Sequence, residues 1–131
     1  MAAVTNGLPY MPLWVKDLLS DTNWRGMESY DRGMYMTLLA VQWNEKGKGL
    51  PDDENLLWAN SDCTYPMDST EWERFYGHWV MLLFPAGQDG KRRNPRCHEE
   101  WCKVMVAQRG RSIGGKRGAE TRRQQQDSKT L

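Results

Sequence analysis

Apolar residues recur at helical spacing in the first long patterned stretch of the chain, residues 28–49. Two stripes with intervals of three or four residues run along it: Tyr30, Met34, Leu38 and Val41 form one, and Tyr35, Leu39 and Trp43 form the other. Two stripes predict a helix that is buried over much of its circumference. Gly47 and Gly49 predict its end, because glycine readily adopts the left-handed conformation that closes a helix.

A short segment with a different pattern follows directly. Leu50-Pro51 leaves the helix, since proline restricts the residue before it and cannot continue the hydrogen bonding. Asp52 or Asp53 can then cap a new helix in which the apolar residues 56–58 face inward. A long helix, a tight turn and a short helix predict the beginning of a helix-turn-helix.

The next apolar repeat follows Ser69, which is a favourable N-cap residue. It has the i, i+3, i+4, i+7 spacing of a helix and consists of Trp72, Phe75, Tyr76 and Trp79. The unbroken apolar run over residues 80–84 changes the pattern and predicts a strand instead.

A hairpin and a final helix complete the predicted fold. Asp89-Gly90 is a strong turn signal between the strand at 80–84 and a second strand at 91–96. A last helix is predicted from about Cys97 to Arg109. The prediction is a mostly α fold with a small β-hairpin, namely a winged-helix-like three-helix core followed by a C-terminal helix and a flexible basic tail. The winged-helix-like domain spans residues 1–109, and the tail, expected to be disordered when free, spans residues 110–131.

Charge divides the chain into two parts. Residues 1–86 carry six Lys or Arg against twelve Asp or Glu, a net charge of −6, whereas residues 87–131 carry twelve against five, a net charge of +7. An acidic body with a basic tail predicts an anionic partner for the tail, and nucleic acid is the usual candidate.

The chain also resembles the YdaU-like prophage family over roughly residues 11–118. The residues that carry the resemblance near the N-terminus are Asp17, Ser20-Asp21-Thr22, Arg32-Gly33, Tyr35, Leu38-Leu39, Trp43 and Leu50-Pro51-Asp52-Asp53. Those further along are Phe84, Gly90, Asn94, Arg96, Glu100 and the segment RSIGGKRGAE. The resemblance implies a winged-helix-like domain associated with phage DNA replication initiation, and it implies no catalytic residues.

Cations of the predicted wing and of the tail are the candidate phosphate ligands. They are Lys91, Arg92, Arg93, Arg96, Arg109, Arg111, Lys116, Arg117, Arg122 and Arg123. The alternative is that the wing cations only protect an exposed strand edge from pairing with another chain. Asp68, Glu71 and Glu73 on the helix over 69–79 would repel phosphate, so weak sequence preference is expected.

Other chemistries find little support in the residue pattern. The three cysteines have no C-x₂-C spacing, so neither a zinc site nor a disulfide framework is expected. The segment GRSIGGKR fits the start of a phosphate-binding loop, but Arg117 stands where that loop needs Ser or Thr. No nucleophile has a base at a recognisable spacing. We therefore expect no enzyme activity, no catalytic residues, no metal and no cofactor.

The N-terminus has neither a basic start nor a long apolar run, which predicts a cytoplasmic protein without a membrane partner. The expected function is nucleic-acid binding in phage or prophage DNA replication initiation or its control, with DNA favoured over RNA. One alternative is an adaptor whose acidic, Trp-rich body docks a replication, transcription or host protein. The other is a transcriptional regulator with real sequence specificity.

Overall fold

The computed structural model describes residue 11 and residues 15–110, and these divide into two compact units between Trp101 and Cys102. The first unit is mostly helical and contains one small two-stranded antiparallel sheet, in agreement with the predicted mixture of elements. The second unit, as far as it is described, is helical over residues 102–110.

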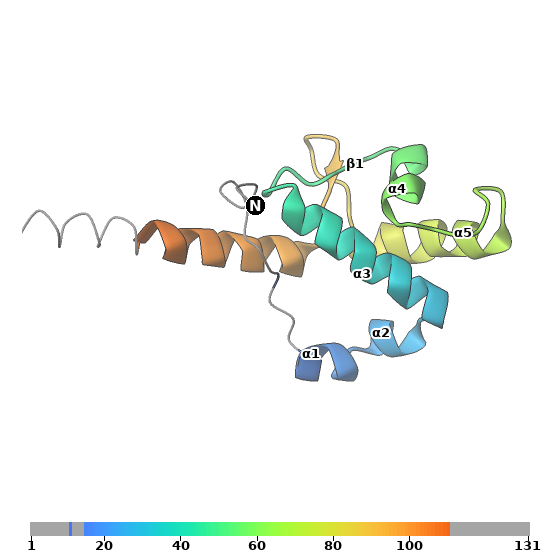
Figure 1. Ribbon diagram of the computed structural model, residues 1–131, viewed down its shortest axis with the longest axis horizontal. Helices are drawn as coiled ribbons and strands as arrows, with labels where there is room; N and C mark the ends of the chain where they lie inside the picture. The colour runs from blue at the N-terminus through green and yellow to red at the C-terminus, as the bar shows by residue number, and fades with distance from the viewer. Residues whose placement is uncertain (1–10, 12–14, 111–131) are drawn as a thin grey trace, which may run out of the picture. The chain divides into compact units, whose positions relative to one another are not determined.

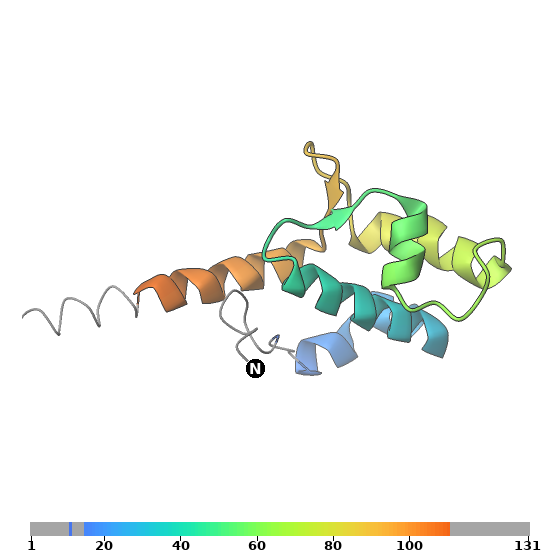
Figure 2. The same cartoon turned by 45° about the horizontal axis from the view of Figure 1, so that its top comes forward.

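Helix α3 (Ser29–Asn44) lies at the centre of the first unit. The short helices α1 (Val15–Ser20) and α2 (Thr22–Gly26) lie on one side of it and the later elements lie on the other, as Figure 1 and Figure 2 show. A capping box closes its first turn, in which Asp31 Oδ2 accepts a hydrogen bond of 3.0 Å from the backbone N–H of Glu28.

Burial along α3 confirms the two predicted stripes in their central part. Leu38 is completely buried, and Met34, Leu39 and Trp43 are nearly so. The helix ends at Asn44, and the chain turns through Gly47 and Gly49, which both have positive φ angles. These glycines supply the predicted stop.

The chain then forms the strand β1 (Leu50–Pro51) and the helix α4 (Glu54–Asn60). Asp53 is the N-cap of α4, and its Oδ1 accepts a hydrogen bond of 3.1 Å from the backbone N–H of Leu56. Leu57 is fully buried, whereas Leu56 is exposed. The predicted capping aspartate and inward-facing leucine are therefore confirmed at residues 53 and 57.

The next helix is continuous from residue 70 to residue 83, and we call it the α5–α6 helix. It consists of α5 (Thr70–Arg74), a π-helical segment η2 (Phe75–Val80) and α6 (Met81–Leu83). Ser69 Oγ caps it by accepting a hydrogen bond from the backbone N–H of Trp72.

The predicted strand over residues 80–84 is wrong, because these residues continue the helix. An apolar run alone does not distinguish a buried strand from a buried helix, and no helix-breaking residue occurs before Pro85. Val80 and Phe84 are fully buried, while Met81 and Leu82 face solvent. Burial at i and i+4 is the periodicity of a helix.

A short hairpin follows, and its pairing also differs from the prediction. The second strand is only β2 (Lys91–Arg92) and not residues 91–96; it pairs with β1 in antiparallel register, with Leu50 opposite Arg92. An isolated bridge joins Ala86 to Arg92, and the chain reverses at the predicted Asp89-Gly90 turn.

The last helix begins earlier than predicted, at residue 95. Proline is well suited to the first helical position, because its missing N–H would have no helical partner there. Asn94 caps this helix, since its Oδ1 accepts a hydrogen bond of 3.0 Å from the backbone N–H of Cys97.

A buried polar pair joins α3 to the start of this last helix. Gln42 Oε1 accepts a hydrogen bond of 2.7 Å from the backbone N–H of Asn94, and Gln42 Nε2 donates one of 3.1 Å to the backbone carbonyl of Asn94. Asn94 Nδ2 also donates to the carbonyl of Leu83. One side chain on α3 and one after the hairpin therefore connect three helices.

Gly49 tests the close packing of the turn after α3 against the hairpin. A Cβ atom at this position would lie 2.9 Å from Arg93 Cγ and 3.0 Å from the carbonyl oxygen of Arg92, at a φ of +83°. Gly49→Ala should therefore lower the free energy of unfolding by about 1–3 kcal/mol in urea titrations.

Gly33→Ala is the matched control, because a Cβ atom there meets nothing within 4 Å inside α3. It should raise the free energy of unfolding by about 0.5–1 kcal/mol, the usual gain for alanine in a helix. Equal unfolding midpoints for the two variants would contradict the described packing at Gly49.

Candidate nucleic-acid interface

The hairpin over residues 86–92 extends away from the helices, as Figure 2 shows. Gly87 N–H donates a hydrogen bond of 2.7 Å to the carbonyl of Lys91, and Gly90 N–H donates one of 3.2 Å to the carbonyl of Gly87. Asp89 Oδ1 accepts from the backbone N–H of Lys91. The tip is therefore held by local hydrogen bonds, and its cations can be placed.

Arg92 points inward and is only 9% exposed, so the expectation that it lies on the surface is wrong. Its Nε forms an ion pair of 2.6 Å with Asp52 Oδ1, and its Nη1 donates a hydrogen bond of 3.0 Å to the carbonyl of Phe84. Arg92 thus connects the segment after β1, the end of the α5–α6 helix and the hairpin. Its guanidinium is a structural group.

Arg93 joins the hairpin to the turn that follows α3. Its Nε donates to the carbonyl of Gly47 at 3.0 Å, and its Nη2 donates to the carbonyl of Lys48 at 2.8 Å. Both of its terminal nitrogens also reach the carboxylate of Asp89, with the shorter contact at 2.7 Å. This hydrogen bonding from Arg93 is the main reason why the pKa of Asp89 falls to about 2.

Arg96 forms an ion pair of 2.8 Å with Asp17 of α1, and both side chains are more than half exposed. Exposed pairs of this kind contribute about 0–1 kcal/mol to stability. Such a pair can therefore exchange its partner at little cost.

The remaining candidates differ from these three arginines. Among the described residues, no carboxylate lies at ion-pair distance from Lys91 or Arg109. Lys91 is half-buried in the hairpin of the first unit, and Arg109 is exposed in the second unit. The other five predicted cations, Arg111, Lys116, Arg117, Arg122 and Arg123, lie outside the described residues.

The outward face of the α5–α6 helix carries few donors for base edges. Its exposed residues are Thr70, Glu73, Arg74, Gly77, His78, Met81 and Leu82. Helices that enter the major groove usually present Arg, Lys, Asn or Gln to the bases. This face matches the acidic character predicted from the sequence.

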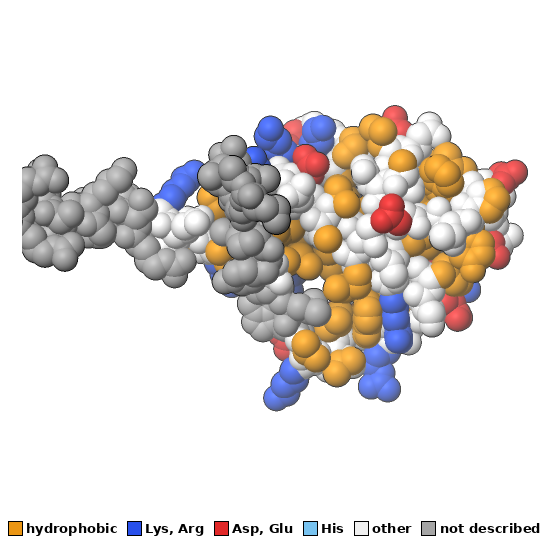
Figure 3. All heavy atoms as spheres, viewed as in Figure 1, with side chains coloured by type: hydrophobic (Ala, Val, Ile, Leu, Met, Phe, Trp, Pro, Cys, Tyr) orange, Lys and Arg blue, Asp and Glu red, His pale blue; other side chains and the backbone are white. Residues whose placement is uncertain are grey.

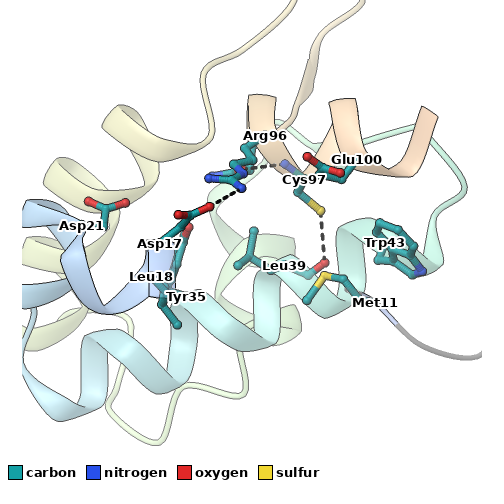
Figure 4. Close-up of a pocket in the computed structure, with 11 residues that line it drawn as sticks. Met11, Asp17, Leu18, Asp21, Tyr35, Leu39, Trp43, Arg96, Cys97 and Glu100 are labelled. Carbon is teal, nitrogen blue, oxygen red and sulfur yellow. Dashed lines mark hydrogen bonds and ion pairs between the residues drawn. The ribbon is translucent and has the colours of Figure 1, made fainter. Parts of the chain in front are cut away.

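A small cavity lies between α1, α3 and residues 94–100, with a volume of about 100 Å³. The Arg96–Asp17 ion pair and the apolar side chains of Leu39 and Trp43 are among its lining residues (Figure 4). Burial raises the pKa of the Cys97 thiol to about 11. The thiol therefore stays protonated at neutral pH, where it donates to the carbonyl of Leu39 across 3.8 Å.

The cysteines are all free thiols. Cys63 donates a hydrogen bond of 3.4 Å to the carbonyl of Tyr65, away from the buried Cys97. Within residue 11 and residues 15–110, no three His, Cys, Asp or Glu side chains come together in an arrangement that could hold a metal ion.

Sequence reasoning missed Gln42 and Asn94, which position the chain on either side of this interface. The signal that could have found them is a polar residue on an otherwise apolar face of α3. Gln42 lies between Leu39 and Trp43 on the buried side, where an amide requires partners.

Comparison of the chain with protein-family models, with curated proteins and with solved structures gives no match. In the part of the chain that the structure describes, no helix has both the length and the apolar character needed to cross a bilayer.

Arg92→Ala should separate the structural cation from the exposed ones. It leaves Asp52 and the Phe84 carbonyl without their partner, and it should lower the free energy of unfolding by about 2–3 kcal/mol, less than for a fully buried pair. Lys91→Ala, the neighbouring control, should change it by less than about 0.5 kcal/mol. Similar thermal melting temperatures for both variants would contradict the inward role of Arg92.

Arg93→Ala should raise the pKa of Asp89 from about 2 toward its ordinary value of 3.8. Because the folded-state pKa is the lower one, the stabilisation from this pair is complete above about pH 4 and is lost as pH falls toward 2. An NMR titration of the side-chain carboxyl measures this pKa. Lys91→Ala retains the backbone donor to Asp89 and should leave the pKa near 2; equal values in both variants would refute the assigned cause.

Proposed function

We propose that this chain is a winged-helix-like nucleic-acid-binding protein of phage or prophage type, acting in the cytoplasm in DNA replication initiation or its control. The proposal rests on one structural observation, the order of elements. Helix α3 is followed by β1, α4, the α5–α6 helix and a hairpin whose strand β2 pairs with β1. A helical core with a paired hairpin at its edge is the arrangement of a winged helix.

The described geometry narrows the phosphate contacts within the hairpin. Lys91 and Arg93 are the hairpin cations that can reach a phosphate. The pair between Arg93 and Asp89 lies largely on the surface, so a phosphate can compete with the carboxylate for the terminal guanidinium nitrogens. Arg92 is excluded from this role because its guanidinium is buried against Asp52.

The basic segment supplies the larger share of positive charge. Arg109 and the five predicted cations beyond residue 110 are separate from the hairpin and belong to the second unit. Phosphate contacts of this kind give affinity without sequence readout. Duplex DNA should therefore be bound with little sequence preference, in keeping with the acidic residues on the α5–α6 helix.

The salt dependence of binding tests the proposal. On duplex DNA the slope of log affinity against log salt should become shallower by ~0.9 for each phosphate contact removed. Deleting residues 111–131 removes Arg111, Lys116, Arg117, Arg122, Arg123 and Lys129, and it should reduce the slope more than any single substitution. Lys91→Ala should reduce the slope by less than one contact or by one.

Lys16→Ala on α1 is the matched control, since it removes the same charge from an exposed helix away from the hairpin. Its slope should equal that of the intact protein. Identical slopes for the intact protein, the deletion and Lys91→Ala would contradict phosphate binding and favour the adaptor alternative. The same titration on single-stranded RNA tests the preference for DNA.

A further inference from the structure

The α5–α6 helix has an outward face that contacts no other part of the described first unit as a packed surface. We define this face by its exposed residues Glu73, Arg74, Gly77, His78, Met81 and Leu82. Its last turn is apolar: the Met81 side chain is 37% exposed and that of Leu82 is 53% exposed. Two neighbouring large apolar side chains at the surface are a typical feature of an interaction site.

The charge around this face is strongly one-sided. All of the −6 net charge of residues 1–86 arises from residues 52–74, which contain seven Asp or Glu and only one cation, Arg74. These residues include α4 and the beginning of the α5–α6 helix, and Figure 3 shows several acidic side chains on the end of the molecule where α4 and α5 lie. An apolar patch with acidic surroundings is complementary to an apolar surface with basic surroundings.

The middle of the face has a gap between side chains. Gly77 lies in the π-helical segment η2, and a Cβ atom at this position would meet nothing within 4 Å. A glycine without neighbours allows another backbone to approach closely. π-Helical turns inside α-helices occur frequently at functional sites.

We propose that this outward face docks a basic amphipathic helix of another protein. Met81 and Leu82 would contact its apolar stripe, Gly77 would allow its backbone to approach, and the carboxylates of residues 52–74 would face its cations. This is the helix-in-groove mode of peptide recognition, in which anchors recur every three or four residues. The proposal goes beyond nucleic-acid binding, because it uses a different surface.

Other occupants fit the face less well. Nucleic acid and anionic lipid would place phosphates against the acidic residues. The chain's own basic segment, residues 111–131, contains only Ile113 and Leu131 as large aliphatic residues. A second copy of that segment therefore lacks the paired apolar anchors that this face requires.

The probe for the test is a fluorescein-labelled 18-residue peptide of Leu and Lys with helical periodicity, titrated with the full-length chain by fluorescence anisotropy. The intact chain should bind it. Met81→Ser combined with Leu82→Ser should weaken binding by at least about tenfold, the loss expected for truncated anchor residues. Gly77→Leu should weaken it comparably, because the new side chain has space in the free protein but blocks the approach of the peptide.

Val15→Ser combined with Leu19→Ser is the control, since both residues are exposed apolar side chains on α1, at 56% and 58% exposure. Its affinity should stay within about twofold of the intact chain. Circular dichroism checks that each variant folds. The salt slope on duplex DNA should be the same for all these variants, so failure here and failure of nucleic-acid binding are distinguishable.

Three control probes decide between explanations. A peptide with the same composition in shuffled order, a Leu and Glu version, and a peptide of residues 111–131 should all bind at least about tenfold more weakly. Equal binding of the shuffled peptide would reduce the interaction to charge alone and overturn the proposal. So would equal affinity of all variants, no binding of the Leu and Lys peptide, equal binding of the 111–131 peptide, or displacement by duplex DNA.

Discussion

The pairing of Gln42 with the backbone of Asn94 is the interaction on which the rest of the first unit depends. The amide of Gln42 satisfies both the N–H and the carbonyl of Asn94 inside the protein, as a neighbouring strand would. A buried polar group without a partner costs roughly 1–3 kcal/mol, so each amide needs the other to stay in the interior. This requirement fixes the distance between α3 and the start of the last helix.

The hairpin takes its position from what Asn94 holds. The Asn94 side chain binds the carbonyl of Leu83 and caps the last helix at Cys97, so the chain between these points must form a short loop. Arg92 and Arg93 then connect that loop to the segments on either side of β1. Positive charge that a reader of the sequence would assign to a ligand is therefore partly used inside the protein.

Much of the helical framework could be predicted, because local chemistry determines it. The stripes of α3, the capping by Asp53 and Ser69, and the reversal at Asp89-Gly90 each depend on residues close together in the sequence. Helix and strand could not be separated in the run over residues 80–84, where every residue is apolar and no period is visible.

The inward roles of the polar residues could not be predicted for a different reason. The partners of Arg92 and Gln42 lie 40 and 52 residues away in the sequence, and pattern analysis has no access to such distances. A cation in a basic run looks the same whether it faces solvent or a distant aspartate. Three of the four predicted wing cations, Arg92, Arg93 and Arg96, have carboxylate partners in the structure.

The close contact at Gly49 has a consequence for how this chain can diverge. The space that a side chain at position 49 would need is occupied by Arg93 Cγ and by the backbone carbonyl of Arg92. Change at position 49 is therefore coupled to change at position 93, and even a smaller residue at 93 would leave the carbonyl and the positive φ in place. Related chains should keep glycine at position 49 even where they exchange the arginines of the hairpin, so this glycine marks the fold and the cations vary with the ligand.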